Sequence, residues 1–262
     1  NEHHSIGLSP LLAYQRFKVD GLQAFTGFSS SMNEVTNKGY ENSYGWGVRA
    51  GWMGKLTDTV SVGAAYSTKV WMSEFDDYKG LFAEQGDFDI PENYNLGIAF
   101  RATPALTLAF DIQWIKYSGV SSIANGVSNS LSAPPANPLG SDNGSGFKWR
   151  DQTVYKLGVE YAYDKSLTLR AGYNYGKSPI RGGGIDDVTF NIIAPGVVEQ
   201  HLTLGATWTL QNGGELTVAY MHAFSNSVTG PSVFQLFGLP ASTTETLKMH
   251  QNSIGIAYGW KM

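Results

Sequence analysis

The feature that most constrains the fold is a cadence of short segments in which apolar or aromatic side chains alternate with small, polar or charged ones. Two clear examples are residues 106–114 (LTLAFDIQW) and 167–175 (LTLRAGYNY). Because successive side chains of a strand point to opposite faces, this alternation gives each strand one apolar face. A tilted segment of about ten residues is long enough to cross a bilayer. The pattern is typical of a transmembrane β-barrel of the outer-membrane kind.

Composition agrees with this class. The 262 residues include 31 Gly, 14 Tyr and 7 Trp but only 15% charged residues, and they contain no apolar run of about 18 residues that could form a spanning helix. A chain like this can cross a membrane only as a closed sheet. The absence of cysteine fits folding in the periplasm without disulfides. The net charge of −4 argues against a nucleic-acid partner.

We therefore predict an all-β protein: one antiparallel transmembrane β-barrel domain over 1–262 in the Gram-negative outer membrane. The alternation predicts about eleven strands, which are 6–16, 22–31, 44–55, 60–72, 91–102, 105–118, 149–163, 166–178, 194–210, 215–227 and 248–260. They are joined alternately by short turns, the first at 18–21, and by long loops at about 32–43, 73–90, 120–147, 179–193 and 228–247. Short turns face the periplasm in this class, so the first predicted strand, which ends at the short turn 18–21, would start on the outer side of the membrane. The first and last predicted strands would then both run toward the periplasm, and closing the barrel would require them to pair in parallel. We therefore expect further strands upstream of Asn1.

The apolar parity predicts the lipid face. In the strongest strand it comprises Leu106, Leu108, Phe110, Ile112 and Trp114. Near the short turns, an inner aromatic belt is expected from Tyr14, Trp52, Phe100, Tyr161, Trp208 and Tyr258. Proline cannot donate to a ladder, so Pro195 is expected outside it, with strand 194–210 pairing with 166–178 and 215–227.

Charged side chains take the opposite parity and are expected in the lumen, because Arg or Lys on the lipid face costs about 2–4 kcal/mol near the midplane. The basic ones could bind a substrate carboxylate, or they could form an ion-pair lattice that holds the barrel shape. These carboxylate-binding candidates are Arg49, Lys69, Arg101, Lys156 and Arg170.

The long loops carry apolar side chains that could catch a hydrophobic substrate or could simply pack on one another. The loop-groove candidates are Phe75, Tyr78, Leu81, Phe82, Val233, Phe234, Leu236 and Phe237. The five histidines show no metal-ligand spacing, and Gly182–Gly184 does not open a helix as a phosphate loop would. We predict no catalytic residue, no metal site and no cofactor.

From about residue 44 onward the chain resembles the long-chain fatty-acid transporter (FadL-like) family of outer-membrane proteins, which includes importers of aromatic hydrocarbons. The matching stretches are 45–51 (GWGVRAG), 88–94 (FDIPENY), 147–151 (FKWRD), 155–158 (YKLG) and, most specifically, 195–205 (PGVVEQHLTLG). The resemblance implies a barrel of about fourteen strands, closed by an N-terminal hatch, that moves hydrophobic molecules inward without energy input. The hatch and about three leading strands have no counterpart here, and the loop at 32–43 is short for its half of the family's substrate groove.

The leading hypothesis is passive uptake of a long-chain fatty acid or a similar hydrophobic molecule. Import of an aromatic or alkyl hydrocarbon, which needs no carboxylate partner, is the main alternative, followed by a structural or adhesive barrel. A hydrolase would need a nucleophile beside a histidine, and only His201 is placed as a lumen base. The expected partners are the hydrophobic substrate, membrane lipid and lipopolysaccharide, and a monomer is expected.

Overall fold

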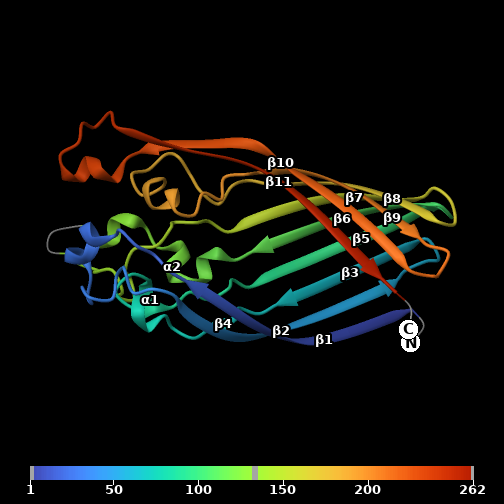
Figure 1. Cartoon of the computed structure of the whole chain (residues 1–262), viewed down its shortest axis with the longest axis horizontal. Coiled ribbons are helices and arrows are strands. Elements are labelled where there is room, and N and C mark those ends of the chain that lie inside the picture. The colour runs from blue at the N-terminus through green and yellow to red at the C-terminus, as the bar shows by residue number, and fades with distance from the viewer. Residues whose placement is uncertain (1–2, 132–134, 261–262) are drawn as a thin grey trace.

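The structure is a computed structural model that describes residues 3–131 and 135–260, so residues 132–134 of the predicted loop 120–147 lie outside the described part. The described residues form one antiparallel sheet of ten long strands and one two-residue strand (Figure 1). In chain order the strands are β1 (His4–Phe17), β2 (Glu41–Lys55), β3 (Val60–Ser67), β4 (Trp71–Met72), β5 (Asn93–Thr103), β6 (Leu106–Ile115), β7 (Gln152–Ala162), β8 (Leu167–Gly176), β9 (Gln200–Thr209), β10 (Glu215–Pro231) and β11 (Thr244–Gly259). Neighbours in sequence pair in space, except that β4 pairs with β2 at the rim.

The register aligns the apolar faces of neighbouring strands into continuous rows. At mid-height Ile98 of β5 lies opposite Val62 and Phe110, Phe110 lies opposite Leu157, and Leu157 lies opposite Tyr173. Along β5, exposed apolar residues alternate with half-buried ones of the other parity, as expected for the convex and concave faces of a curved sheet. The predicted lipid-facing set of β6 lies in these convex rows, which confirms its parity.

The concave face carries the polar rows. One of them crosses β5 to β9 through Gly97, Asp111, Lys156, Asn174 and His201. The Asp111 side chain occupies the space beside Gly97, because a Cβ at position 97 would lie 2.1 Å from an Asp111 carboxylate oxygen. Small residues thus make room for the longer polar side chains that share the interior.

The two ends of the sheet differ in the length of their connections. Four short turns, at 56–59, 104–105, 163–166 and 210–214, join strands at one end. At the other end the long connections carry the helical turns η1 (Gln23–Phe28), η2 (Asp76–Tyr78), α1 (Ala83–Gly86), η3 (Tyr117–Gly119), α2 (Ser121–Ala124), η4 (Val127–Ser130), η5 (Thr189–Ile192) and η6 (Val233–Phe237), which pack together as a cap (Figure 1). None of the helices described is long and apolar enough to cross a membrane.

One predicted strand is wrong. Residues 22–31 contain the 3₁₀ helix η1 and no long strand, so 18–21 is part of one long cap loop and not a short turn. Gly21, Asn37 and Gly39 have left-handed backbone (φ 89°, 61° and 84°), which lets this loop fold back on itself. The predicted total of about eleven strands is met because β4 takes the place of the missing one.

This correction reverses the direction predicted for β1. His4 lies opposite Gly54, beside a short turn, and Gly259 at the end of β11 lies opposite Glu215, beside another. β1 and β11 therefore run antiparallel to each other, and both described ends of the chain lie at the short-turn end (Figure 1). A parallel closing pair is not required. Tyr14, opposite Tyr44, lies near the cap and not in the inner aromatic belt.

The predictions for strand 194–210 hold. β9 pairs with β8 and β10, although it begins at Gln200. Pro195 lies in the irregular segment before it, where no ladder hydrogen bond is needed from its nitrogen.

Candidate functional site

The cap is held together by contacts between loops that are far apart in sequence. The Ser30 amide donates to the carbonyl of Leu139 (2.9 Å), and the Leu139 amide donates to that of Phe28 (2.8 Å). Phe25 packs edge-on against Phe190 at 5.5 Å between ring centroids. These contacts join loop 18–40, the loop between β6 and β7, and the loop between β8 and β9 into one body.

An apolar cavity of about 230 Å³ lies inside the cap, and we call it the outer cavity. It is lined by Phe17, Leu22, Phe25, Leu81, Phe82, Ser122, Leu139, Ser145, Gly146, Phe147, Thr189, Phe190, Ile192, Ile193 and Phe234. Its three hydroxyl groups are already engaged with the main chain: Ser122 and Ser145 donate to the carbonyls of Asp87 and Val127, and Thr189 accepts from the amide of Val233. Among the described residues, the wall therefore offers contact to an apolar molecule and no charged partner.

A second cavity of about 620 Å³, the strand-side cavity, lies against the end of β1, where Gln15, Arg16 and Phe17 contribute to its wall. The two cavities share four lining residues, Phe17, Phe82, Phe147 and Ile193, which we call the partition. The two cations on the strand-side wall have other partners. The Arg16 guanidinium lies 3.9 Å from the Tyr40 ring centroid, and Lys18 pairs with Asp20 at 2.9 Å.

The predicted loop-groove residues fall into three environments. Leu81, Phe82 and Phe234 line the outer cavity, and Phe75 and Phe82 line the strand-side cavity. Tyr78 and Val233 are fully buried in the packing of the cap. Leu236 and Phe237 are about half exposed, and Phe237 packs edge-on against Phe28. The loops thus both pack on one another and leave a cavity.

The five basic candidates lie outside both cavities. Four are held by side chains on the concave face or at its rim: Lys69 by Asp89 (3.2 Å), Arg170 by Glu160 (2.8 Å), Lys156 by the amide oxygen of Gln113 (2.8 Å) and Arg49 by the Ser67 hydroxyl (2.7 Å). The fifth, Arg101, lies opposite Thr107.

Most of the outer cavity was not predicted. Phe147 enters the sequence analysis only as part of a family motif, Phe17 falls between the predicted strand 6–16 and the predicted turn 18–21, and Phe25 falls in the wrongly predicted strand 22–31. A usable signal exists in loop 18–40: Leu22, Phe25 and Phe28 recur every three residues, which is the 3₁₀ period and not the strand period.

Two acidic residues, Asp87 and Asp89, lie beside the partition. Asp89 is nearly buried, accepts from the Met72 amide (2.7 Å) and pairs with Lys69. Burial, followed by the neighbouring charge of Asp89, raises the pKa of Asp87 to about 7. Phe88, between these two acids, lines the strand-side cavity and packs against Phe82 at 4.9 Å.

We expect Asp87→Asn to remove a pH dependence of the cap. Because the pKa of Asp87 is raised in the folded state, the folded protein binds the proton more tightly than the unfolded chain, so stability falls as pH rises from about 4 to about 7. The variant should match the wild type near pH 4, where little of the proton-linked stability has been lost, and be the more stable of the two at pH 8. Urea midpoints measured across this range test the prediction, with Asp58→Asn in a short turn as the control. A wild-type midpoint that rises over the range and is unaffected by Asp87→Asn contradicts it.

A sheet with a convex apolar face, a concave polar face, short turns at one end and a cap of loops at the other defines an outer-membrane β-barrel of Gram-negative bacteria. Residues 1–258 match the family model described as outer membrane protein transport protein (OMPP1/FadL/TodX). The chain belongs to this family.

Solved structures support the same fold. The Pseudomonas putida toluene transporter TodX is 18% identical with a TM-score of 0.61, and the alignment covers 100% of this chain and 66% of that one. The Ralstonia pickettii toluene transporter TbuX is 17% identical with a TM-score of 0.57, and the alignment covers 98% of this chain and 63% of that one. A Pseudomonas aeruginosa FadL homologue is 18% identical with a TM-score of 0.58, and the alignment covers 98% of this chain and 64% of that one. The chain thus spans slightly less than two thirds of the length of these relatives. A comparison with curated proteins found no match.

Proposed function

We propose that this protein takes up small, uncharged hydrophobic molecules through the outer membrane, and that a monoaromatic hydrocarbon is the best-fitting substrate class. The outer cavity carries the proposal. Its volume of about 230 Å³ is larger than the roughly 150 Å³ apolar cavity that binds benzene in another protein. The solved relatives TodX and TbuX are described as toluene transporters.

The cavity chemistry favours a neutral substrate over a fatty acid, which was the leading hypothesis from sequence. Among the residues that the structure describes, no lysine, arginine or histidine lines the outer cavity. Burying a carboxylate without a cationic or hydrogen-bonding partner is strongly unfavourable. A hydrocarbon needs only the apolar wall, because removing apolar surface from water is favourable by about 25 cal/mol per Å².

Uptake by diffusion through such a cavity needs no chemical step and no cofactor. His201, the lumen base considered for a hydrolase, hydrogen-bonds through Nδ1 with the amide oxygen of Asn174 at 2.7 Å. On the sheet it lies opposite Asn174 on one side and Ala223 on the other, so neither of these neighbours supplies a nucleophile.

The test is uptake by cells whose only protein of this family is the full-length protein, supplied with radiolabelled toluene or oleate at low concentration. We expect toluene uptake above the empty-vector level. Ile192→Trp, which places a bulkier side chain on the wall of the outer cavity, should lower it several-fold, whereas Leu236→Trp on η6, at a residue that does not line this cavity, should leave it unchanged.

Three results would count against this proposal. Saturable uptake of oleate without uptake of toluene returns the function to fatty-acid transport. No uptake of either compound favours a structural or adhesive barrel. Loss of uptake with Leu236→Trp but not with Ile192→Trp moves the site from the cavity to the exposed groove.

A further inference from the structure

Lys148 has a backbone conformation that is rare for a residue with a long side chain. Its φ is +54°, in the left-handed region that glycine and asparagine prefer. It directly follows Phe147 of the partition and precedes Trp149, which lines the strand-side cavity. A strained residue that the surrounding structure holds in place, beside a cavity, points to a positioning role.

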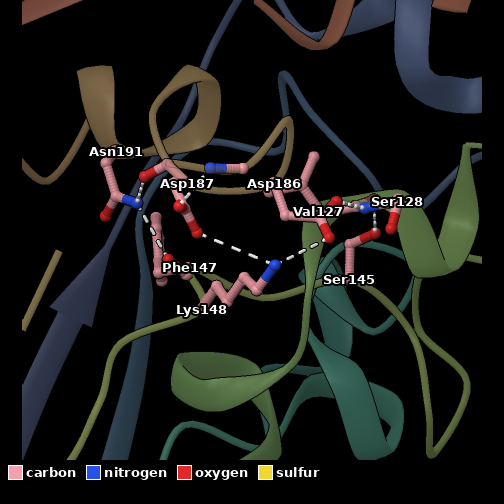
Figure 2. Close-up of polar contacts among 9 residues, drawn as sticks. Val127, Ser128, Ser145, Phe147, Lys148, Asp186, Asp187 and Asn191 are labelled. Carbon is pink, nitrogen blue, oxygen red and sulfur yellow. Dashed lines mark hydrogen bonds and ion pairs between the residues drawn. The ribbon is translucent and has the colours of Figure 1, made fainter. Parts of the chain in front are cut away.

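The Lys148 ammonium group connects two loops. Its Nζ lies 2.9 Å from Oδ2 of Asp186 and 3.7 Å from Oδ1 of Asp187, which belong to the loop between β8 and β9 (Figure 2). The two acids are well shielded, with 15% and 5% of their side chains exposed, whereas 39% of the Lys148 side chain is exposed. We call these three residues the clasp.

Hydrogen bonds hold both acids in the geometry that the lysine meets. The Ser128 amide donates to Asp186 Oδ1 (2.6 Å), and the Gly184 amide donates to Asp187 Oδ2 (2.7 Å). Burial alone would raise the pKa of Asp186, but the hydrogen bonds from Ser128 and Lys148 hold it below its ordinary value. Asp186 is thus kept charged, and both carboxylates are held in contact with the lysine.

Asn191 ties the same two loops together a short distance away. Its Nδ2 donates to the carbonyls of Phe147 (2.8 Å) and Asp187 (2.9 Å), and its Oδ1 accepts from the Trp149 indole (2.6 Å). The loop between β8 and β9 also packs closely on β10, since a Cβ on Gly182 would lie 2.3 Å from the Thr229 carbonyl oxygen. The clasp is therefore the charged element of the joint between the loop that carries Phe147 and the loop that carries Ile193.

We propose that the clasp sets the size limit for substrates by holding Phe147 and Ile193 of the partition together between the two cavities. Lys148 is a positioning residue in this proposal, which rests on the proposed uptake function. Without its charge, the two adjacent shielded carboxylates of the loop between β8 and β9 lose the cation that joins them to the loop carrying Phe147. The two loops then separate at the clasp, which widens the passage from the outer cavity to the strand-side cavity.

The experiment compares Lys148→Met with Lys148→Arg in the full-length protein. Methionine keeps an unbranched apolar stem but no charge, and arginine keeps the charge. Uptake of toluene and of the larger naphthalene is measured in the same cells, and heat-modifiable gel migration confirms that each barrel is folded. We expect the ratio of naphthalene to toluene uptake to rise several-fold with Lys148→Met and to stay within about twofold of the wild type with Lys148→Arg.

A second pair of measurements covers misfolding of the first variant and failure of the proposed function. The double variant Asp186→Asn with Asp187→Asn removes the clasp from the other side and should raise the ratio in the same way. The sequence has no cysteine, so Ser145→Cys, a nearly buried position on the outer-cavity wall, reports access without any transport. A maleimide should label it faster when Lys148→Met is also present.

The outcomes separate the two ideas. If the wild type takes up neither hydrocarbon, the proposed function fails, and the labelling rate alone decides the clasp. If the barrels are folded but neither the uptake ratio nor the labelling rate responds to loss of the clasp charges, the clasp does not control the passage. If Lys148→Arg behaves like Lys148→Met, the charge is not what positions the partition.

Discussion

Replacing Ile98 by arginine should destabilise the barrel by about 2–4 kcal/mol, the cost of a cationic side chain on the lipid face near the bilayer midplane. Ile98 is at the middle of β5 on the convex face, 45% exposed in the protein alone, with Val62 and Phe110 as its cross-strand neighbours. Those neighbours offer no counter-charge. Urea unfolding of the protein in lipid vesicles, followed by tryptophan fluorescence, measures the loss.

Asn95→Arg is the matched control for this prediction, because it makes the same side chain on the same strand but on the opposite face. Asn95 lies opposite Gln113 in the polar interior, where water and polar side chains can solvate a cation. We expect a change within about 0.5 kcal/mol. If Asn95→Arg proves the more damaging of the two, the face assignment of the whole sheet is inverted.

Replacing Tyr78 by alanine should open the cap while the barrel stays folded. Tyr78 is fully buried, its hydroxyl donates to the Gly39 carbonyl (2.6 Å) and accepts from the Val19 amide (3.3 Å), and its ring packs edge-on against Phe17 at 4.9 Å. Truncation of a buried aromatic residue costs about 3–5 kcal/mol. Such a loss raises local opening by at least about 100-fold, since each 1.4 kcal/mol is a factor of ten.

Limited proteolysis measures that opening, and heat-modifiable migration reports the barrel separately. Tyr78→Phe, which keeps the ring, should lie between wild type and alanine, because it loses only the two hydrogen bonds. Tyr40→Ala, a 64% exposed residue of the same cap, should have little effect. If Tyr78→Ala leaves proteolysis unchanged and abolishes toluene uptake, Tyr78 contacts substrate as the sequence suggested and does not hold the cap.

The barrel wall was predictable because alternation is a local property of each strand. The period-2 pattern of residues 106–114 identifies both faces without knowledge of any partner, and neighbouring strands repeat it in register. The pattern was wrong for 22–31, where Leu22, Phe25 and Phe28 supply apolar residues at a spacing of three. A single misassigned strand was enough to reverse β1, since every connection changes the direction of the chain.

The cavity was much less predictable, because its walls are set by contacts between distant residues. Candidates such as Leu81 and Phe234 were found because they are apolar residues in long loops, but apolarity alone did not separate them from Tyr78 and Val233, which are buried in the packing. Nothing local to Phe147 or Ile193 indicates that both line the same two cavities. The positive φ of Lys148 is likewise imposed by the surrounding loops and has no signature in its own side chain.

The outer cavity takes its walls from the end of β1 and from five loops, between Phe17 and Phe234, and this bears on the biogenesis of the protein. Contacts such as Phe25 with Phe190 join residues of large sequence separation, which form late because long segments must first be ordered. The cavity can therefore assemble only after β1 to β10 are in place and their loops have crossed the membrane. A partly inserted chain has no finished cavity, so uptake by the proposed route would begin only in the last stage of assembly, when the wall that surrounds the cavity already exists.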